Sequence, residues 1–216
     1  MDFKWLLKGF VESIFVVASI LLALAVDEWS QDRDFAQLAD QSLGIFESEI
    51  QQNSARLADL SPYHQGIRDL LGRMNAMPPQ EVDVRSIMEG LQTPVLLNAA
   101  WETALATGAL NHMDFEVVSA LSLTYSIQDG FQSRSRLERP RFVGPEGLSD
   151  ARMIEQLDEA YEYVTSLTRD ESELVAVYDQ ALAMIHGHRD DGHVDAAVVG
   201  RPNRKFKLWG KYVYYI

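Results

Sequence analysis

The sequence contains no cysteine. This absence excludes disulfide bonds, thiol catalysis and zinc–thiolate sites, but it does not assign a cellular compartment. Positive charge is scarce between residues 27 and 200, where 12 basic side chains stand against 30 acidic ones and give a net charge of −18. Such a segment repels a phosphate backbone, so we expect it to bind no nucleic acid.

Recognisable catalytic and cofactor motifs are also missing. The chain has no G-x-S-x-G sequence, no Walker loop, no Rossmann fingerprint and no calcium-loop pattern. Neighbouring carboxylates such as Glu47/Glu49 and Asp158/Glu159 are typical of an ordinary helix surface. We therefore predict a protein that is not an enzyme, with no catalytic residues and no cofactor.

One histidine cluster suggests a metal site. His186, His188 and His193 lie within eight residues, together with Asp190 and Asp191. Imidazoles and carboxylates suit zinc or nickel, but this spacing matches no established ligand pattern, and two glycines favour a flexible loop. We interpret the stretch as a solvated linker after a helix and expect no metal site.

Long hydrophobic runs are limited to one, near the N-terminus. Gly9 to Val26 reads GFVESIFVVASILLALAV, and extending it back to Trp5 gives 22 residues. As a helix this segment is roughly 33 Å long, close to the ~30 Å thickness of a bilayer's hydrocarbon core. Trp5 and Trp29 then lie near the two interfaces, which indole rings prefer. The sequence predicts a transmembrane span over residues 5–26.

Glu12 leaves two interpretations of this span open. It is either a tolerated charge near the Trp5 end or a carboxylate that pairs with a partner or handles protons inside a membrane complex. Ala23-Leu24-Ala25 also fits a signal-peptide cleavage site. Glu12 interrupts the apolar core of such a peptide, and helical sequence continues past Ala25, so we favour a retained anchor.

The charges that flank the span predict its orientation. Lys4 and Lys8 precede it, whereas Asp27, Glu28 and Asp32 follow it. The positive-inside rule places the N-terminus in the cytoplasm and the body on the other side of the cytoplasmic (inner) membrane, which is the periplasm in a bacterium.

Two stretches resemble a known group of proteins. The segment VESIFVVASILLALAVDEW, with its Glu-bearing apolar span and acidic-Trp step, resembles the start of a group of bacterial single-span membrane proteins. Residues 100–104 (AWETA), leading to Gly108-Ala109-Leu110, resemble the middle region of those proteins. Together these stretches cover about a fifth of the chain. The group has no known activity, so the resemblance implies a membrane anchor and no site residues.

The body after the span has the periodicity of amphipathic helices. Apolar residues recur at three- and four-residue steps up to Leu60, with Asn53 in one core-facing position, and Ser61-Pro62 is expected to end this first helix. A shorter helix is predicted over Tyr63–Asn75, before Pro78-Pro79.

The middle of the chain predicts shorter helices. We expect a brief helix over residues 83–91 and another that opens at Thr93-Pro94 and continues through Trp101 to Thr107. Asp114 is the predicted N-cap of the next helix. Residues 140–147 (PRFVGPEG) predict a loop.

The last long helix is predicted to begin near Ser149. Its apolar seam runs in alternating four- and three-residue steps to Ile185, interrupted at Thr168 and Glu171. Long helices with such seams predict an all-α protein in which the transmembrane helix continues into an antiparallel helical bundle. The expected divisions are an anchor over 1–28, a bundle over 29–195 and a basic-aromatic tail over 196–216.

Aromatic residues outside the span have two interpretations each. Trp101 lies in an Ala-rich segment and is expected to pack in the core, with ligand stacking as the alternative. Tyr125, Tyr161, Tyr163 and Tyr178 are expected at the bundle core or rim. The tail from Arg201 to Ile216, with a net charge of +5, suits either anionic lipid or the acidic bundle.

The functional prediction from these features is a membrane-anchored interaction or scaffold protein. Its expected partners are the lipid bilayer and a membrane protein or a second copy of the chain. The alternative is a ligand-sensing helical domain that acts through a membrane partner, because the chain shows no signalling domain of its own.

Overall fold

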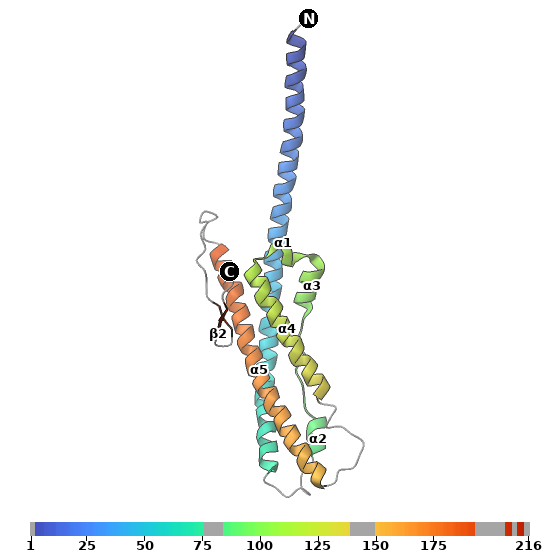
Figure 1. Cartoon of the computed structure of the whole chain (residues 1–216), viewed down its shortest axis with the longest axis vertical. Coiled ribbons are helices and arrows are strands. Elements are labelled where there is room, and N and C mark those ends of the chain that lie inside the picture. Colours follow the sequence, from blue (N-terminus) through green and yellow to red (C-terminus); the bar gives the residue numbers. More distant parts are fainter. Residues whose placement is uncertain (1–2, 76–83, 139–149, 193–205, 209–210, 214–216) are drawn as a thin grey trace.

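The chain is all-α, as the sequence predicted. A computed structural model describes residues 3–75, 84–138, 150–192, 206–208 and 211–213. The helix α1 (Phe3–Met74) spans the full length of the molecule, and its N-terminal part extends alone beyond the bundle (Figure 1). The helices α4 (Phe115–Glu138) and α5 (Asp150–Gly192) lie beside its second half. The chain directions alternate from α1 to α5 and from α5 to α4, which makes the bundle antiparallel.

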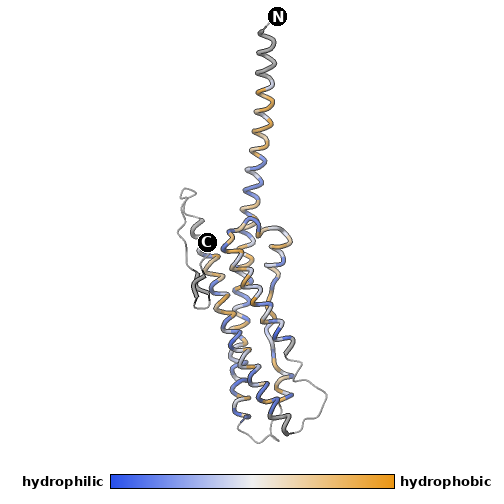
Figure 2. Tube along the Cα trace, viewed as in Figure 1, coloured by the Kyte–Doolittle hydropathy of each residue, from blue (hydrophilic) through white to orange (hydrophobic). Residues whose placement is uncertain are grey.

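The free part of α1 carries the predicted span. Figure 2 shows apolar turns along this part, followed by polar turns before the bundle begins. Its large apolar side chains are half or more exposed, including Phe15 at 69% and Leu22 at 67%. Within the described residues, α1 is the one helix long and apolar enough to cross a membrane, by length and composition. The side chain of Glu12 lies outside the described residues.

The prediction that Ser61-Pro62 ends the first helix is wrong, because α1 continues through Pro62 to Met74. Pro62 is on the exposed face of the helix. Proline has no backbone N–H, so the Ala58 carbonyl lacks the hydrogen bond that residue 62 would donate in a regular helix. This carbonyl lies on the exposed side of the helix, where water can bind it. On the opposite face, Leu57, His64 and Leu71 are all buried at seven-residue steps. Burial on both sides of the proline therefore holds the two predicted helices in one rod.

The connection between α1 and α4 contains two short helices and an extended segment. The helix α2 (Val84–Glu89) is within the predicted range, but α3 (Ala99–Thr107) begins six residues after Thr93, where the sequence predicted its start. Residues 90–98, which we call the connector, are not helical. Side chains of α1 and α4 bind the connector backbone, and these hydrogen bonds replace those a helix would form.

The ends and seams of α4 and α5 agree with the sequence. The Asp114 carboxylate accepts a hydrogen bond from the Glu116 backbone N–H at 2.9 Å, which confirms the predicted N-cap of α4. Gly108, between α3 and the short 3-10 helix η2 (Ala109–His112), has φ of +73°, a conformation that glycine adopts without strain. Along α5 the predicted seam positions are buried or partly buried from Leu157 to Ile185.

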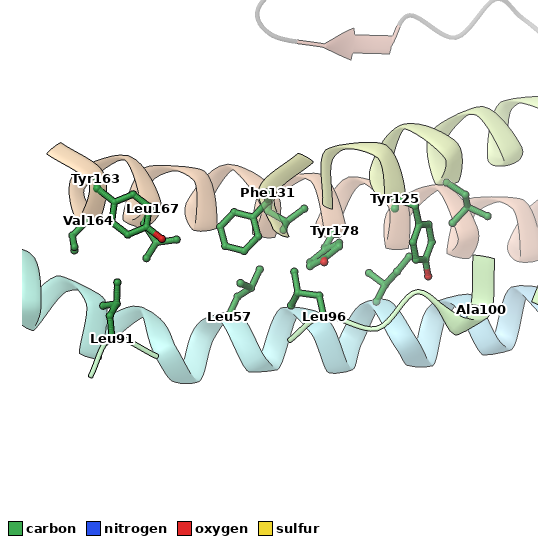
Figure 3. Close-up of a cluster of buried hydrophobic side chains, with 14 of the residues drawn as sticks. Leu57, Leu91, Leu96, Ala100, Tyr125, Phe131, Tyr163, Val164, Leu167 and Tyr178 are labelled. Carbon is green, nitrogen blue, oxygen red and sulfur yellow. The ribbon is translucent and has the colours of Figure 1, made fainter. Parts of the chain in front are cut away.

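One continuous hydrophobic core fills the space between the long helices. Figure 3 shows Leu57 of α1 and Phe131 of α4 pointing toward each other, and Val164 and Leu167 of α5 opposite Leu91 of the connector. Leu96 of the connector belongs to the same cluster. The connector and α3 thus take the place of a fourth helix along the bundle.

The tail is described only in part. The strands β1 (Phe206–Leu208) and β2 (Lys211–Val213) form an antiparallel pair in which Phe206 faces Val213. The predicted loop over 140–147 and the remainder of the tail lie outside the described residues, so docking of the tail on lipid or on the bundle stays a prediction.

Candidate functional site

Buried polar side chains form a line along the inside of the bundle. They come from all three long helices and lie among the apolar residues of the core, and they include Glu49, Asn53, His64, Thr124, Gln128, Thr168 and Glu171. Burying a polar group destabilises the folded state unless the group is hydrogen-bonded. The positions of these side chains therefore depend closely on the geometry of their hydrogen-bond partners.

Glu49 lies at the end of the line nearest the anchor. Its Oε1 accepts a hydrogen bond from the Tyr125 hydroxyl at 2.7 Å, and its Oε2 accepts one from the Ala100 backbone N–H at 3.0 Å. The carboxylate therefore binds a free N–H in the first turn of α3, where negative charge is favourable. Burial, the hydrogen bond to Glu49 and the charge of Glu49 raise the pKa of Tyr125. The interpretation of Glu49 as an ordinary surface carboxylate is wrong.

Asn53 holds the connector by both sides of its amide. Its Nδ2 donates to the Leu97 carbonyl and its Oδ1 accepts from the Leu97 N–H, each at 2.8 Å. The Gln128 side chain donates to the same carbonyl at 2.8 Å and accepts from Asn53 and from the Tyr178 hydroxyl. The N–H and the C=O of Leu97, in the extended connector, are thus both hydrogen-bonded to side chains.

Three further contacts fix the connector at other points. The Gln132 amide donates to the Leu96 carbonyl and Arg56 donates to the Val95 carbonyl, both at 2.8 Å. The Tyr63 hydroxyl donates to the Gly90 carbonyl at 3.1 Å. Side chains of α1 and α4 thus bind the connector backbone along most of its length, so its position depends on both helices.

His64 and Glu171 form a fully buried pair farther from the anchor. Their relative exposures are 0% and 1%, and His64 Nδ1 lies 2.7 Å from Glu171 Oε1. His64 Nε2 lies 2.6 Å from the Gln92 carbonyl oxygen. One imidazole therefore joins three segments, namely α1, the connector and α5.

Charged side chains also join α1 to α5 at the end of the bundle near the anchor. Arg189 Nη1 lies 2.7 Å from Glu47 Oε2, and His186 Nε2 lies 2.8 Å from Glu47 Oε1. The hydrogen bond to His186 lowers the pKa of Glu47, and Arg189 acts in the same direction, whereas burial opposes both. Because α5 continues to Gly192, the interpretation of residues 186–192 as a linker is wrong.

Of the three clustered histidines, the structure describes the side chains of His186 and His188. His186 contacts Glu47, His188 is partly buried on α5, and His193 lies outside the described residues. Among the described residues, no three His, Asp or Glu side chains are grouped closely enough to hold a metal ion.

Trp101 packs against other aromatic rings. Its ring stacks on Tyr125 with a centroid distance of 5.7 Å and lies 6.4 Å from the ring of Phe46. The prediction that Trp101 serves core packing is confirmed. The four tyrosines expected at the core or rim also lie there, with Tyr125, Tyr163 and Tyr178 buried and Tyr161 partly buried.

Sequence periodicity found part of this line of polar residues. Asn53, Thr168 and Glu171 were visible as polar residues at apolar seam positions, a pattern that signals a buried hydrogen bond. His64 was missed because the expected helix end at Pro62 separated it from the seam of α1.

Comparisons of the chain with protein-family models, curated proteins and solved structures found no match. The resemblance to bacterial single-span membrane proteins therefore stays a prediction. The class of protein that the fold defines is an all-α bundle joined to one helix of membrane-spanning length.

Proposed function

We propose that this protein is a membrane-anchored interaction protein, whose span lies near residues 5–26 and whose bundle binds a protein partner at the membrane surface. The observation that carries the proposal is the continuity of α1. The same helix leaves the apolar segment and contributes Leu43, Phe46 and Ile50 to the bundle core. A rigid connection of this kind fixes the position of the bundle relative to the bilayer.

The end of the bundle nearest the anchor offers a contact surface for such a partner. Leu105, near the end of α3, is 56% exposed, and Phe115, at the start of α4, is 80% exposed. Between them, η2 packs on α1, where His112 stacks on Phe35 at 4.0 Å. Exposed aromatic and aliphatic side chains are the usual anchors of protein interfaces. The same end of the bundle faces the free part of α1, where a second membrane protein would lie.

The flanking charges support a defined orientation for this proposal. Lys4 and Lys8 precede the apolar segment, and Asp27, Glu28 and Asp32 follow it. We therefore place the N-terminus in the cytoplasm and the bundle outside the cytoplasmic membrane.

A fusion experiment tests the orientation. A reporter enzyme that is active only outside the cytoplasm, fused after Ile216, should be active, and a reporter that is active only in the cytoplasm should be silent. The control fuses each reporter after Lys8, which should give the opposite pattern. A fusion after Ile216 that is active only with the cytoplasmic reporter would contradict the proposed orientation.

Site-specific crosslinking tests the contact surface. Because the natural chain has no cysteine, Phe115→Cys and Leu105→Cys each create a single attachment point for a photoreactive maleimide. We expect both positions to form one adduct of the same mass in membranes. Asp129→Cys, at an exposed position farther along α4, is the matched control and should form none. An adduct of twice the chain mass identifies a second copy as the partner, and no adduct at either position contradicts the proposal.

The alternative of a ligand-sensing domain has no comparable support. It relied on Trp101 as a stacking surface for a small molecule, and the Trp101 ring already stacks on Tyr125 within the core.

A further inference from the structure

The geometry around His64 requires one proton between His64 and Glu171. The Gln92 carbonyl oxygen accepts hydrogen bonds and donates none, so the contact of 2.6 Å assigns a hydrogen to His64 Nε2. The 2.7 Å contact between His64 Nδ1 and Glu171 Oε1 then needs a second hydrogen, carried by the imidazole or by the carboxyl group. Without it, a carboxylate oxygen would face the lone pair of Nδ1 inside the core.

We propose that the His64–Glu171 pair is a proton-dependent lock, which holds α5 and the connector against α1 while it carries this proton and releases them when the proton is lost. The lock regulates the packing of the bundle and does not depend on the proposed membrane function. It acts at the place where α1, the connector and α5 meet in one side-chain contact.

Among the charged groups around His64, Glu171 is the one whose charge acts on the imidazole. On α1, the neighbouring group is the Tyr63 ring, whose centroid is 5.2 Å from that of His64. On α2, Arg85 and Glu89 pair with each other, and next to Glu171 on α5, Asp170 pairs with Arg134 of α4. Within the described part of the chain, Glu171 Oε2 has no hydrogen-bond partner, so a deprotonated pair would gain no compensation there.

The pKa of His64 is consistent with a retained proton. Burial opposes the charged imidazolium and is the largest single effect on this pKa. The hydrogen bonds to Glu171 and to the Gln92 carbonyl, together with the charge of Glu171, outweigh it and raise the pKa of His64 above its ordinary value.

The direction of the pH effect follows from the number of protons bound. An unfolded chain keeps one proton on this pair between about pH 4.3 and 6.5, and the folded chain also keeps one, so stability does not depend on the pair there. Above about pH 6.5 the unfolded chain loses that proton, whereas the folded chain retains it up to the raised pKa of His64. In this window the equilibrium constant for unfolding should rise about tenfold per pH unit.

Glu171→Gln gives a lock that does not need the proton. The amide of glutamine can donate a hydrogen bond to Nδ1 of a neutral imidazole, while Nε2 still donates to the Gln92 carbonyl. In this variant the folded chain holds His64 neutral, so stability should be constant above about pH 6.5 and should fall below it. The stability of the wild type should therefore fall above about pH 6.5, whereas the stability of Glu171→Gln should fall below it.

The test is urea unfolding of the full-length chain in detergent micelles, followed by circular dichroism between pH 5 and 9. The ratio of the unfolding constants of wild type and Glu171→Gln should change about tenfold per pH unit. Taking this ratio cancels the effect of the other titrating groups, because both proteins contain them. Glu162→Gln, an exposed carboxylate on the same helix, is the control and should follow the wild type. Parallel profiles for wild type and Glu171→Gln would overturn the proposal.

A measurement on the unaltered pair covers the case in which Glu171→Gln does not fold. The full chain is labelled with ¹⁵N-histidine and carries His186→Gln, which removes the histidine that contacts Glu47. At least one imidazole should keep both ring nitrogens protonated after the pH passes the ordinary histidine pKa near 6.5. Loss of the proton from every imidazole in that range would overturn the proposal.

Discussion

Replacing His64 by Ala should lower the free energy of unfolding of the bundle by about 3–5 kcal/mol, the usual cost of removing one partner from a buried ion pair. The substitution leaves the Glu171 carboxylate with neither oxygen partnered, because Oε2 already has no partner in the described part of the chain. It also leaves the Gln92 carbonyl without the imidazole N–H and opens a cavity beside Glu171. Urea unfolding of the full-length chain in micelles, followed by circular dichroism, measures the change.

His188→Ala is the matched control for this substitution. His188 is partly buried on α5 and does not belong to the His64–Glu171 contact, so its replacement should change the free energy by no more than about 0.5 kcal/mol. A loss of under 1 kcal/mol for His64→Ala would show that the buried pair does not hold α1, the connector and α5 together.

Asn53→Ala should cost about 3 kcal/mol and should release the connector before the rest of the bundle. The change removes both hydrogen bonds to Leu97 and the one to Gln128. The Leu97 carbonyl keeps the Gln128 amide, but the Leu97 N–H loses its partner, at about 1–3 kcal/mol for an unsatisfied buried donor. The cavity left by the fully buried side chain adds to this cost.

Hydrogen exchange measured by mass spectrometry locates this effect. Peptides covering residues 90–98 should exchange faster in Asn53→Ala than in wild type, while peptides from the centre of α5 should change less. Gln52→Ala, whose exposed side chain bonds only Ser48 one turn away, should leave both regions unchanged. Equal acceleration over the whole bundle would contradict a specific role for Asn53 in holding the connector.

Helix content was predictable where it depended on local signals. The seam of α5 repeats at four- and three-residue steps, and one face of a helix with this period is continuous, so burial from Leu157 to Ile185 follows from the order of residues. The N-cap at Asp114 is equally local, because its carboxylate binds an N–H two residues later.

Two boundaries were wrong because distant residues decided them. By local rules Pro62 should end a helix, yet α1 continues through it. The hydrogen bond lost at Pro62 lies on the exposed face of α1, while the opposite face stays packed in the core. Thr93-Pro94 is a typical helix start, yet the connector stays extended because Asn53 and Gln128 bind its backbone from two other helices. No pattern within residues 90–98 reveals those partners.

The sequence alone determined the apolar segment of membrane-spanning length, the acidic body and the amphipathic helices, since each depends on composition or on spacing along one chain segment. Tertiary structure alone decided which polar residues are buried together. Glu49 and His64 have no unusual neighbours in the sequence, and their partners are 28 to 107 residues away. The free energy of such a contact depends on removing both groups from water at hydrogen-bond distance, and the packing of α1, α4 and α5 sets that distance.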